Sequence, residues 1–308
     1  MITLPALMNA STPYLGETIA VVTAVIWALA VIFFKKSGES VHPIGLNLFK
    51  NVLAAVLFVP TAWLFGETLL RSVPAEEYIM LLVSGALGIG ISDTLFFKSL
   101  NVLGAGRSAI VDCLYSPSII ALSMIFLGET LSAWQLVGVT MIVSAVLSIM
   151  VERQSVQTDR RHVLVGVWWG ALAMVTMAVG IVMIKPLLER SPLIWATEIR
   201  LLGGLAVLAV ALILHPSRLA VLKSIGRPQK WGYMLSGSFA GAYVSMVLWL
   251  AGMKYTQAST AAALNQTSNI FVFVFAALIL KEKITPIRMA AIVLGVLGAL
   301  LVTFGSSA

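Results

Sequence analysis

The chain has 308 residues, of which 59% are hydrophobic and only 11% are charged, and its formal net charge is +7. Soluble domains carry about 25% charged residues, so this composition excludes a soluble globular protein and predicts a multi-pass membrane protein. The positive charge would suggest nucleic acid as a partner in a soluble chain. Here most basic residues lie in loops between apolar segments, which is the usual signal of membrane topology, and no nucleic-acid partner is expected.

Several kinds of chemistry are disfavoured by the residue inventory. The one cysteine, Cys113, lies inside an apolar segment, so no disulfide framework is predicted. His42, His162 and His215 lack metal-ligand spacing and fall in loops, which argues against a metal site and against a membrane-embedded enzyme. The sequence contains no G-x-x-x-x-G-K-[ST] phosphate-binding loop, and we therefore expect no cofactor and no ATP hydrolysis.

In chain order, the first apolar segment is predicted to be a retained helix, because the N-terminus lacks the basic region and cleavage pattern of a signal peptide. A membrane span needs about 20 apolar residues. Ten segments qualify: 15–34, 44–65, 77–97, 104–127, 132–151, 164–187, 193–214, 231–253, 258–280 and 286–304. The polar stretches between them, including 215–230, are predicted to be loops. The fold class expected is therefore an all-α integral membrane bundle of ten transmembrane helices.

The two halves of the chain repeat each other. Five helices (1–151) are followed by a polar linker (152–163) and five more (164–308). Offsets of 150 and 153 residues match several polar or small residues: Gly16 with Gly166, Lys50 with Arg200, Ser92 with Ser245, Asp112 with Asn265, Ser116 with Asn269 and Glu129 with Glu282. Because five is odd, the second copy enters the membrane from the opposite side, as in inverted-repeat secondary transporters.

Asp112 is the most informative residue of the fourth helix, because a charged residue at mid-membrane depth costs about 2.5–3.5 kcal/mol on insertion scales. Tyr115 and Ser116 share its helical face. Two interpretations remain open: a site for solute or protons, and a static contact with a neighbouring helix. Pro117 cannot donate to the carbonyl of Cys113, so it either kinks the helix beside the pathway or is a tolerated membrane proline.

The ninth helix carries neutral amides at the matching depth, namely Asn265, Gln266 and Asn269. Amides bind the polar head of a zwitterion without burying a charge. The alternative is hydrogen bonding between helices.

Charged residues in other spans supply possible support. Lys50 and Arg200 occupy matched positions in the second helix of each half, and Glu198 is two residues from Arg200. Asp93 lies deep in the third helix. The two cations either extend to the membrane surface, pair with one of these acids or with Asp112, or receive a carboxylate.

Three aromatic residues, Trp27, Tyr115 and Tyr243, lie near mid-depth, where they either stack on a solute or pack. Glu129 and Glu282 fall at helix ends and are predicted to form a cap or a gate contact rather than to bind solute. Together with Asp112 and the amides, Trp27, Tyr243 and Asp93 complete the predicted solute pathway.

Two stretches carry a family resemblance: LGETLSAWQLVGVTMIVSAV at 127–146 and LKEKITPIRMAAIVLGVLGALLV at 280–302. With the five-plus-five repeat and the basic residue in each second helix, the chain resembles the EamA-type (RhaT-like) ten-helix exporters of the drug/metabolite transporter superfamily. The Gly128-Glu129 pattern matches, whereas Lys281 stands where the second copy should have glycine. The resemblance implies efflux of small metabolites, often amino acids, across the plasma (inner) membrane.

Two signals disagree on orientation. About 14 Lys and Arg residues fall on one side of the membrane and about four on the other, which by the positive-inside rule places both termini outside the cytoplasm. The family resemblance implies cytoplasmic termini.

These observations predict a secondary transporter that exports or exchanges a small amphipathic metabolite, such as an amino acid, by alternating access. Its central cavity would form between the first, third and fourth helices of each half. Its partners would be a small-molecule solute, the lipid bilayer and, through Asp112, protons. The alternatives are an exporter of lipophilic cations or drugs, a membrane-embedded enzyme, and a receptor.

Overall fold

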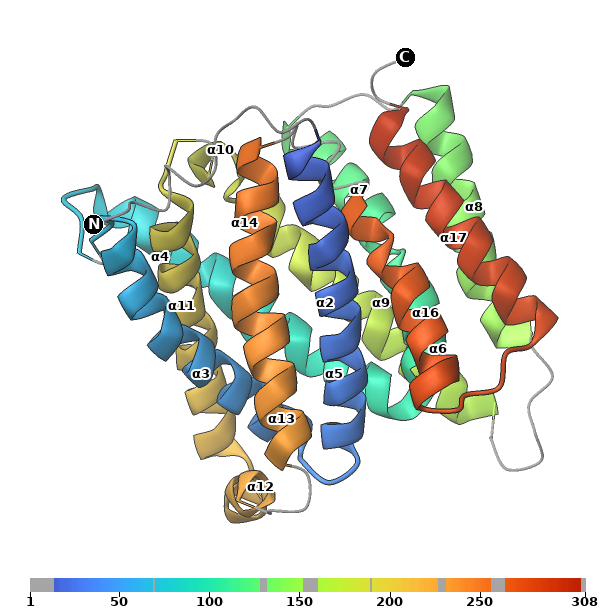
Figure 1. Cartoon of the computed structure of the whole chain (residues 1–308), viewed down its shortest axis with the longest axis horizontal. Coiled ribbons are helices and arrows are strands. Elements are labelled where there is room, and N and C mark those ends of the chain that lie inside the picture. Colours follow the sequence, from blue (N-terminus) through green and yellow to red (C-terminus); the bar gives the residue numbers. More distant parts are fainter. Residues whose placement is uncertain are drawn as a thin grey trace.

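The computed structural model describes residues 14–68, 70–127, 132–151, 160–188, 190–226, 231–255 and 264–305. Within these ranges all regular secondary structure is helical. Most of the helices run side by side in one bundle (Figure 1). The first, α2 (Leu15–Gly38), begins at the same end of the bundle at which the last, α17 (Pro286–Phe304), stops. We call this the terminal end.

The described helices correspond to the ten predicted spans. In the first half they are α2, α3 (Pro43–Leu64), α4 (Ala75–Gly85) with the π-helix η1 (Ala86–Ile91) and α5 (Ser92–Leu103), α6 (Ala105–Asp112) with α7 (Tyr115–Leu127), and α8 (Ala133–Val151). In the second half they are α9 (Arg160–Val182) with α10 (Lys185–Leu188), α11 (Leu193–Leu214), α13 (Trp231–Gly237) with η3 (Ser238–Val244) and α14 (Ser245–Tyr255), α16 (Ser268–Ile279), and α17.

Seven helices of the described chain are long and apolar enough to cross a bilayer, judged by length and composition. Two further apolar helices, Ala133–Ile149 and Leu264–Ile279, are shorter. The all-α membrane fold predicted from the sequence is confirmed.

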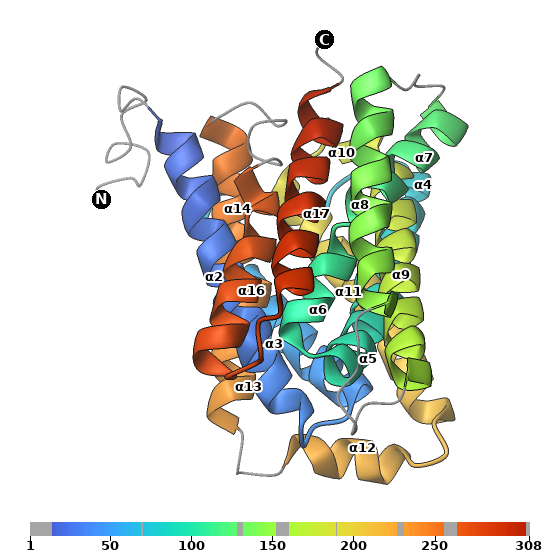
Figure 2. The same ribbon diagram turned by 90° about the vertical axis from the view of Figure 1, so that its right-hand side faces the viewer.

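One predicted loop is wrong. The stretch 215–230 contains a short helix, α12 (Arg218–Ile225), which lies across the end of the bundle opposite to the terminal end (Figure 2). We call this the α12 end. The helix forms because Val221 is buried in a small cluster with Ile44 and Leu208, which gives the otherwise polar segment an apolar anchor.

The two halves are inserted in opposite directions. Gly38, where α2 ends, lies against Asn101 near the end of α5, and Gly166, near the start of α9, lies against Leu103 of the same helix. The end of α2 and the start of α9 therefore meet at the α12 end. The first helix of one half thus runs antiparallel to the first helix of the other.

The halves also pack crosswise. The helix α2 packs against α14 and α16 of the second half, and α9 packs against α5 and α7 of the first. The second helices, α3 and α11, pair with each other, as do the fifth helices, α8 and α17 (Figure 2). All the spans therefore contribute to contacts between the halves: the first, third and fourth spans pack crosswise, and the second and fifth pair with their counterparts.

Glycines allow one very close helix contact in this interface. A Cβ atom on Gly85 of α4 would lie 1.8 Å from the carbonyl oxygen of Arg200 in α11, and one on Gly203 would lie 2.0 Å from the carbonyl oxygen of Leu82. The backbones of α4 and α11 therefore touch, as small residues permit in membrane bundles. This contact fixes the position of Arg200.

We expect Gly85→Ala to destabilise the protein by about 1–3 kcal/mol, because the added methyl group meets backbone that cannot move aside. Gly232→Ala is the matched control, since nothing lies within 4 Å of the Cβ position there. Thermal unfolding of the two purified variants in detergent measures the difference. Equal midpoints would contradict the contact.

Candidate functional site

The third and fourth spans depart from α-helical geometry at matching positions in the two halves. The π-helices η1 and η3 occupy 86–91 and 238–244; at an offset of 153 the first falls on 239–244, so η3 is longer by one residue at its start. The fourth span breaks at Cys113 and Leu114 between α6 and α7, and its counterpart breaks at Thr267 before α16. Such irregularities are frequent at functional sites. They single out one level of the bundle.

Of the two interpretations of Pro117, the structure contains the one in which the helix is disturbed. The helix is interrupted four residues earlier, where the proline cannot donate to the Cys113 carbonyl. The chain tightens instead, with the Leu114 amide donating to the Val111 carbonyl at 3.0 Å. Because of this break, Asp112 is the last residue of α6 and Tyr115 is the first of α7.

The polar residues of the fourth and ninth spans face each other at these breaks. Gln266 Nε2 donates to Ser116 Oγ at 3.1 Å, and Asn269 Nδ2 donates to Gln266 Oε1 at 3.3 Å. Asn269 Nδ2 also lies 3.6 Å from Cys113 Sγ. The structure therefore brings Ser116, Gln266 and Asn269 into one hydrogen-bonded row between the halves, and adds Cys113 to it.

Two acceptors beside this row are left without partners. The Asp112 carboxylate is half-buried, and within the described ranges it forms no hydrogen bond or ion pair. The buried Oδ1 atom of Asn265 likewise has no partner there. Leaving a buried acceptor unsatisfied is costly and calls for a functional explanation. The two residues are repeat mates, so each half presents an open acceptor.

Lys50 and Asp93 form a buried ion pair between α3 and α5. Their exposed fractions are only 5% and 9%, so Lys50 does not extend to the membrane surface. The Lys50 ammonium also lies 5.7 Å from the centre of the Phe97 ring. Of the alternatives considered from the sequence, pairing with Asp93 is the one that the structure contains.

The sequence analysis missed Asn47 and Asn51, two buried amides on the same helix as Lys50. Asn47 Nδ2 donates to the carbonyls of Ile89 and Gly90 in η1 at 2.9 and 3.1 Å, and Asn51 donates to Asn47 Oδ1 at 2.8 Å. The amides thus satisfy carbonyls that the π-helix leaves open. Two asparagines four residues apart in an apolar span were the signal that could have revealed them.

Arg200 is buried with most of its hydrogen-bonding capacity unused. Its Nε donates to Ser84 Oγ at 3.0 Å, and Ser84 Oγ donates to the Gly180 carbonyl at 2.5 Å. In the described part of the chain its two terminal nitrogens make no hydrogen bond. Asp93 and Tyr115 lie within electrostatic range of the guanidinium. Arg200 therefore lies near both the Lys50–Asp93 pair and the break in the fourth span.

Glu198 does not pair with Arg200. Its side chain is buried in α11, and its Oε2 atom has no hydrogen-bond partner among the residues described. The two residues are only two positions apart, so they project from different faces of the helix.

The aromatic residues divide between two places. Trp27 and Tyr115 are partly buried and pack against the main core cluster. Tyr243 lies in η3, where its hydroxyl is 2.7 Å from Thr61 Oγ1 and its ring is 5.5 Å from that of Phe58. Tyr243 therefore contacts α3.

Glu282 joins the halves at the α12 end. Its carboxylate oxygens accept from the backbone amides of Ala105 and Gly106, at 2.8 and 3.0 Å, at the start of α6. Lys35 donates to the Asn101 carbonyl at 2.9 Å in the same region. The predicted cap at Glu282 is confirmed, and it belongs to a helix of the other half. Its repeat mate Glu129 and the preceding Gly128 lie outside the described residues.

A helical membrane bundle with two inverted halves and polar groups at their interface defines a membrane transport protein with inverted repeats. The sequence model of the EamA-like transporter family matches residues 14–151 and again residues 164–304. The chain belongs to this family and is a multi-pass membrane transporter, which confirms the resemblance found in the sequence.

Individual relatives are distant but extend over most of the chain. A protein of Archaeoglobus fulgidus described as an uncharacterized transporter is 23% identical over 284 residues, which is 90% of this chain and 94% of the relative. A chloroplastic WAT1-related protein of Arabidopsis thaliana is 23% identical over 300 residues, covering 94% of this chain and 70% of its own length. A solved crystal structure superposes with a TM-score of 0.68 at 17% identity, covering 96% and 99% of the two chains, and supports the fold alone.

We expect Asp93→Asn to destabilise the protein by about 3–5 kcal/mol, because it leaves the Lys50 ammonium buried without a counter-charge. The double variant Lys50→Met/Asp93→Leu should recover most of that loss, since it removes both charges. Thermal unfolding in detergent of the single and double variants tests the pair. Losses that simply add in the double variant would show that the two side chains are not coupled.

Proposed function

We propose that this transporter exports or exchanges a small zwitterionic metabolite, an amino acid or a related compound, across the plasma (inner) membrane by alternating access. The observation that carries the proposal is unused hydrogen-bonding capacity in both halves: a carboxylate beside the break in the fourth span, and a guanidinium in α11. Asp112 has no partner within the described chain, and the terminal nitrogens of Arg200 are likewise unused.

The two charges suit the two ends of an amino acid. The Asp112 carboxylate and the Asn265 Oδ1 atom are acceptors for an ammonium group. The guanidinium of Arg200 offers two donors to a carboxylate, the geometry that arginine favours for such groups. Tyr115 follows Asp112 after the helix break and lies within electrostatic range of Arg200, so it is placed to contribute to the same site.

The amide row supports recognition of a polar solute rather than a purely apolar one. Ser116, Gln266 and Asn269 are joined by hydrogen bonds that can exchange for bonds to a solute. A lipophilic cation would use Asp112 but would leave the Arg200 guanidinium buried and facing a like charge. The buried arginine therefore favours a zwitterion over the alternative class of lipophilic cations.

The Glu282 cap supports an alternating-access cycle. It ties the end of the ninth span to the start of the fourth, and thus one half to the other, at the α12 end. Opening the interface at that end requires the carboxylate to release the Ala105 and Gly106 amides. In inverted-repeat transporters one half rocks against the other around a central site.

We expect Asp112→Asn to abolish solute flux, or its dependence on pH, in reconstituted liposomes while the protein still inserts. Glu76→Gln is the matched control, because Glu76 is an exposed acid at the start of α4. Uptake of a panel of amino acids and of lipophilic cations is measured over a pH series. Unchanged kinetics in Asp112→Asn would refute proton coupling, and flux of the cations alone would favour the drug-export alternative.

We expect Asn269→Ala to raise the apparent KM about tenfold with little change in the amount of folded protein, since one hydrogen bond to the solute is lost. Concentration-dependent flux in liposomes gives the KM, and size-exclusion chromatography gives the folded amount. A drop in folded protein with an unchanged KM would instead assign Asn269 a purely structural role.

A further inference from the structure

Two histidines at the α12 end form the same kind of turn. His42 and His215 each precede a proline, and their extended backbones, with ψ of 140° and 126°, are typical of that position. In each turn the imidazole Nδ1 atom accepts the backbone amide two residues further on, from Ile44 at 3.3 Å and from Ser217 at 3.1 Å. His42 thereby caps the start of α3, and His215 fixes the turn that leads from α11 into α12.

The two turns meet between the halves of the protein. The start of α3 belongs to the first half and the end of α11 to the second, and the rings of His42 and His215 lie edge to face with their centres 5.1 Å apart. The His42 amide donates to Ser224 Oγ of α12 at 3.1 Å. A Cβ atom on Gly45 would lie 3.1 Å from the side chain of Ile225. The histidine pair therefore lies where α12 is docked on α3.

Both turns require neutral imidazole rings. An Nδ1 atom that accepts an amide carries no proton, so the proton of each neutral ring is on Nε2. A second proton would bind to Nδ1 and remove the hydrogen bond of the turn. It would also place two positive charges on rings whose centres are 5.1 Å apart. The charge on His42 would in addition oppose the positive end of the α3 helix dipole.

The surroundings of His42 oppose its protonation as well. Burial lowers the pKa of His42, and the neighbouring His215 and Lys98 lower it further. Lys98 belongs to α5, and its ammonium lies 4.7 Å from the centre of the Trp169 ring. The groups that act on His42 are therefore basic.

Other ionisable side chains occur at this end of the elements packed against the start of α3, namely Lys35, Lys36 and Glu39 of α2, Arg218 and Lys223 of α12, and Tyr233 of α13. Lys36 and Glu39 pair with each other at 4.0 Å. Lys35 donates to a backbone carbonyl of α5, and the residues of α12 and α13 are exposed. Further along α3 and α5, Lys50 and Asp93 neutralise each other.

We propose that the two His-Pro turns form a pH-sensitive latch, which holds α12 against the start of α3 while both imidazoles are neutral and releases it when they are protonated. A released His42 takes up a proton at the ordinary pKa of about 6.5, whereas in the docked state its pKa is lowered. Docking is therefore strongest above that pH and weakens as the pH falls below it. At about pH 5.5 this one histidine weakens docking by up to about tenfold. The proposal does not depend on the identity of the transported solute.

The test is the reaction of N-ethylmaleimide with Val221→Cys in the purified full chain, because Val221 is only 2% exposed while α12 is docked. Leu219→Cys, at a position 67% exposed on the same helix, measures the intrinsic effect of pH on thiol reactivity. The rate for Val221→Cys divided by that for Leu219→Cys should rise about five- to tenfold from about pH 8 to about pH 5.5. Peptide mass spectrometry separates the introduced thiol from that of the buried Cys113.

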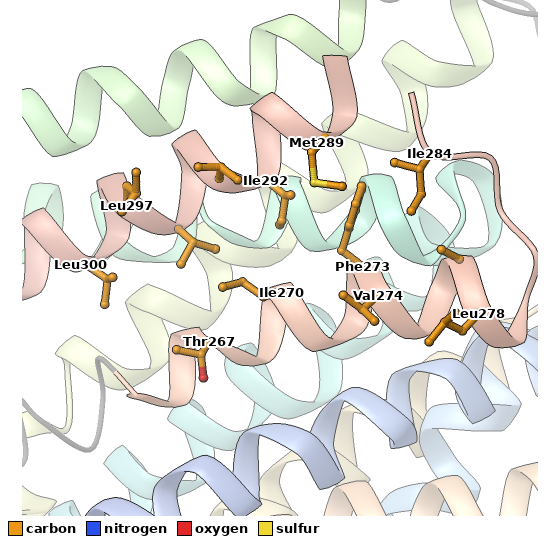
Figure 3. Close-up of a pocket in the computed structure, with 13 residues that line it drawn as sticks. Thr267, Ile270, Phe273, Val274, Leu278, Ile284, Met289, Ile292, Leu297 and Leu300 are labelled. Atoms are coloured by element: carbon orange, nitrogen blue, oxygen red, sulfur yellow. The ribbon is translucent and has the colours of Figure 1, made fainter. Parts of the chain in front are cut away.

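An apolar groove between α16 and α17 supplies the control for general unfolding (Figure 3). Apart from Thr267 every side chain that lines it is apolar, so nothing in the groove titrates. Ile292 lies in this groove and is 2% exposed, as Val221 is. Relative to Leu219→Cys, the variant Ile292→Cys should therefore react equally slowly at both pH values.

His42→Asn and His215→Asn remove the titrating groups but keep a side-chain acceptor for the amide two residues further on. Each should reduce the acid-induced increase, and the double variant should abolish it. His162→Asn, at an exposed histidine near the start of α9, should leave the increase unchanged.

A rate ratio that does not change with pH when both histidines are present, or an increase that survives in the double variant, would overturn the proposal. So would a parallel increase at Ile292→Cys, which would indicate that acid opens the whole bundle. Fast reaction of both single histidine variants already at about pH 8 would assign the rings a packing role alone and overturn it too.

Discussion

The structure depends on a constraint that the bilayer imposes on its backbone: no water is available in the hydrocarbon core to satisfy an open amide or carbonyl. Irregular backbone is therefore confined to places covered by protein. The π-helix η1 and the break at Cys113 lie in spans that build the interface between the halves. Asn47 meets two carbonyls of η1 with its own side chain. The neighbouring helices that bury the irregular backbone also bury polar side chains away from the lipid. Both features therefore occur at one level of the bundle.

Two buried cations at matched positions of the repeat, Lys50 and Arg200, differ in how many of their polar groups have a partner. Lys50 is neutralised by Asp93 and lies over the Phe97 ring, so its charge is already paired without a solute. Arg200 is anchored through Nε to Ser84, while its terminal nitrogens remain available within the described chain. A complete pair contributes to the architecture of the interface, whereas an incomplete one offers binding capacity. In the proposed function, this difference is what separates Lys50, as a supporting charge, from Arg200, as the charge that would meet the solute.

The spans were predictable because bilayer thickness fixes the length of an apolar run, and the polar pairs were found because the two copies match at several polar positions. Other features depend on distances that sequence spacing does not contain. The partner of Lys50 and the placement of Tyr243 against α3 are set by packing between distant segments. The helix α12 has only eight residues, too few for a clear periodic pattern, and its stability comes from the tertiary contact of Val221. Nothing local marks Thr267 as a break, since no proline follows it.

Crosswise packing of the halves has a consequence for biogenesis. Because α2 lies against α14 and α16, and α9 against α5 and α7, each half supplies the helix that completes the other. A ribosome delivers α2 to the membrane long before the helices that it contacts have been synthesised. The helices of the amino-terminal repeat are therefore in the membrane without their packing partners until most of the carboxy-terminal repeat has been translated. Tertiary packing between the halves then follows membrane insertion as a late step.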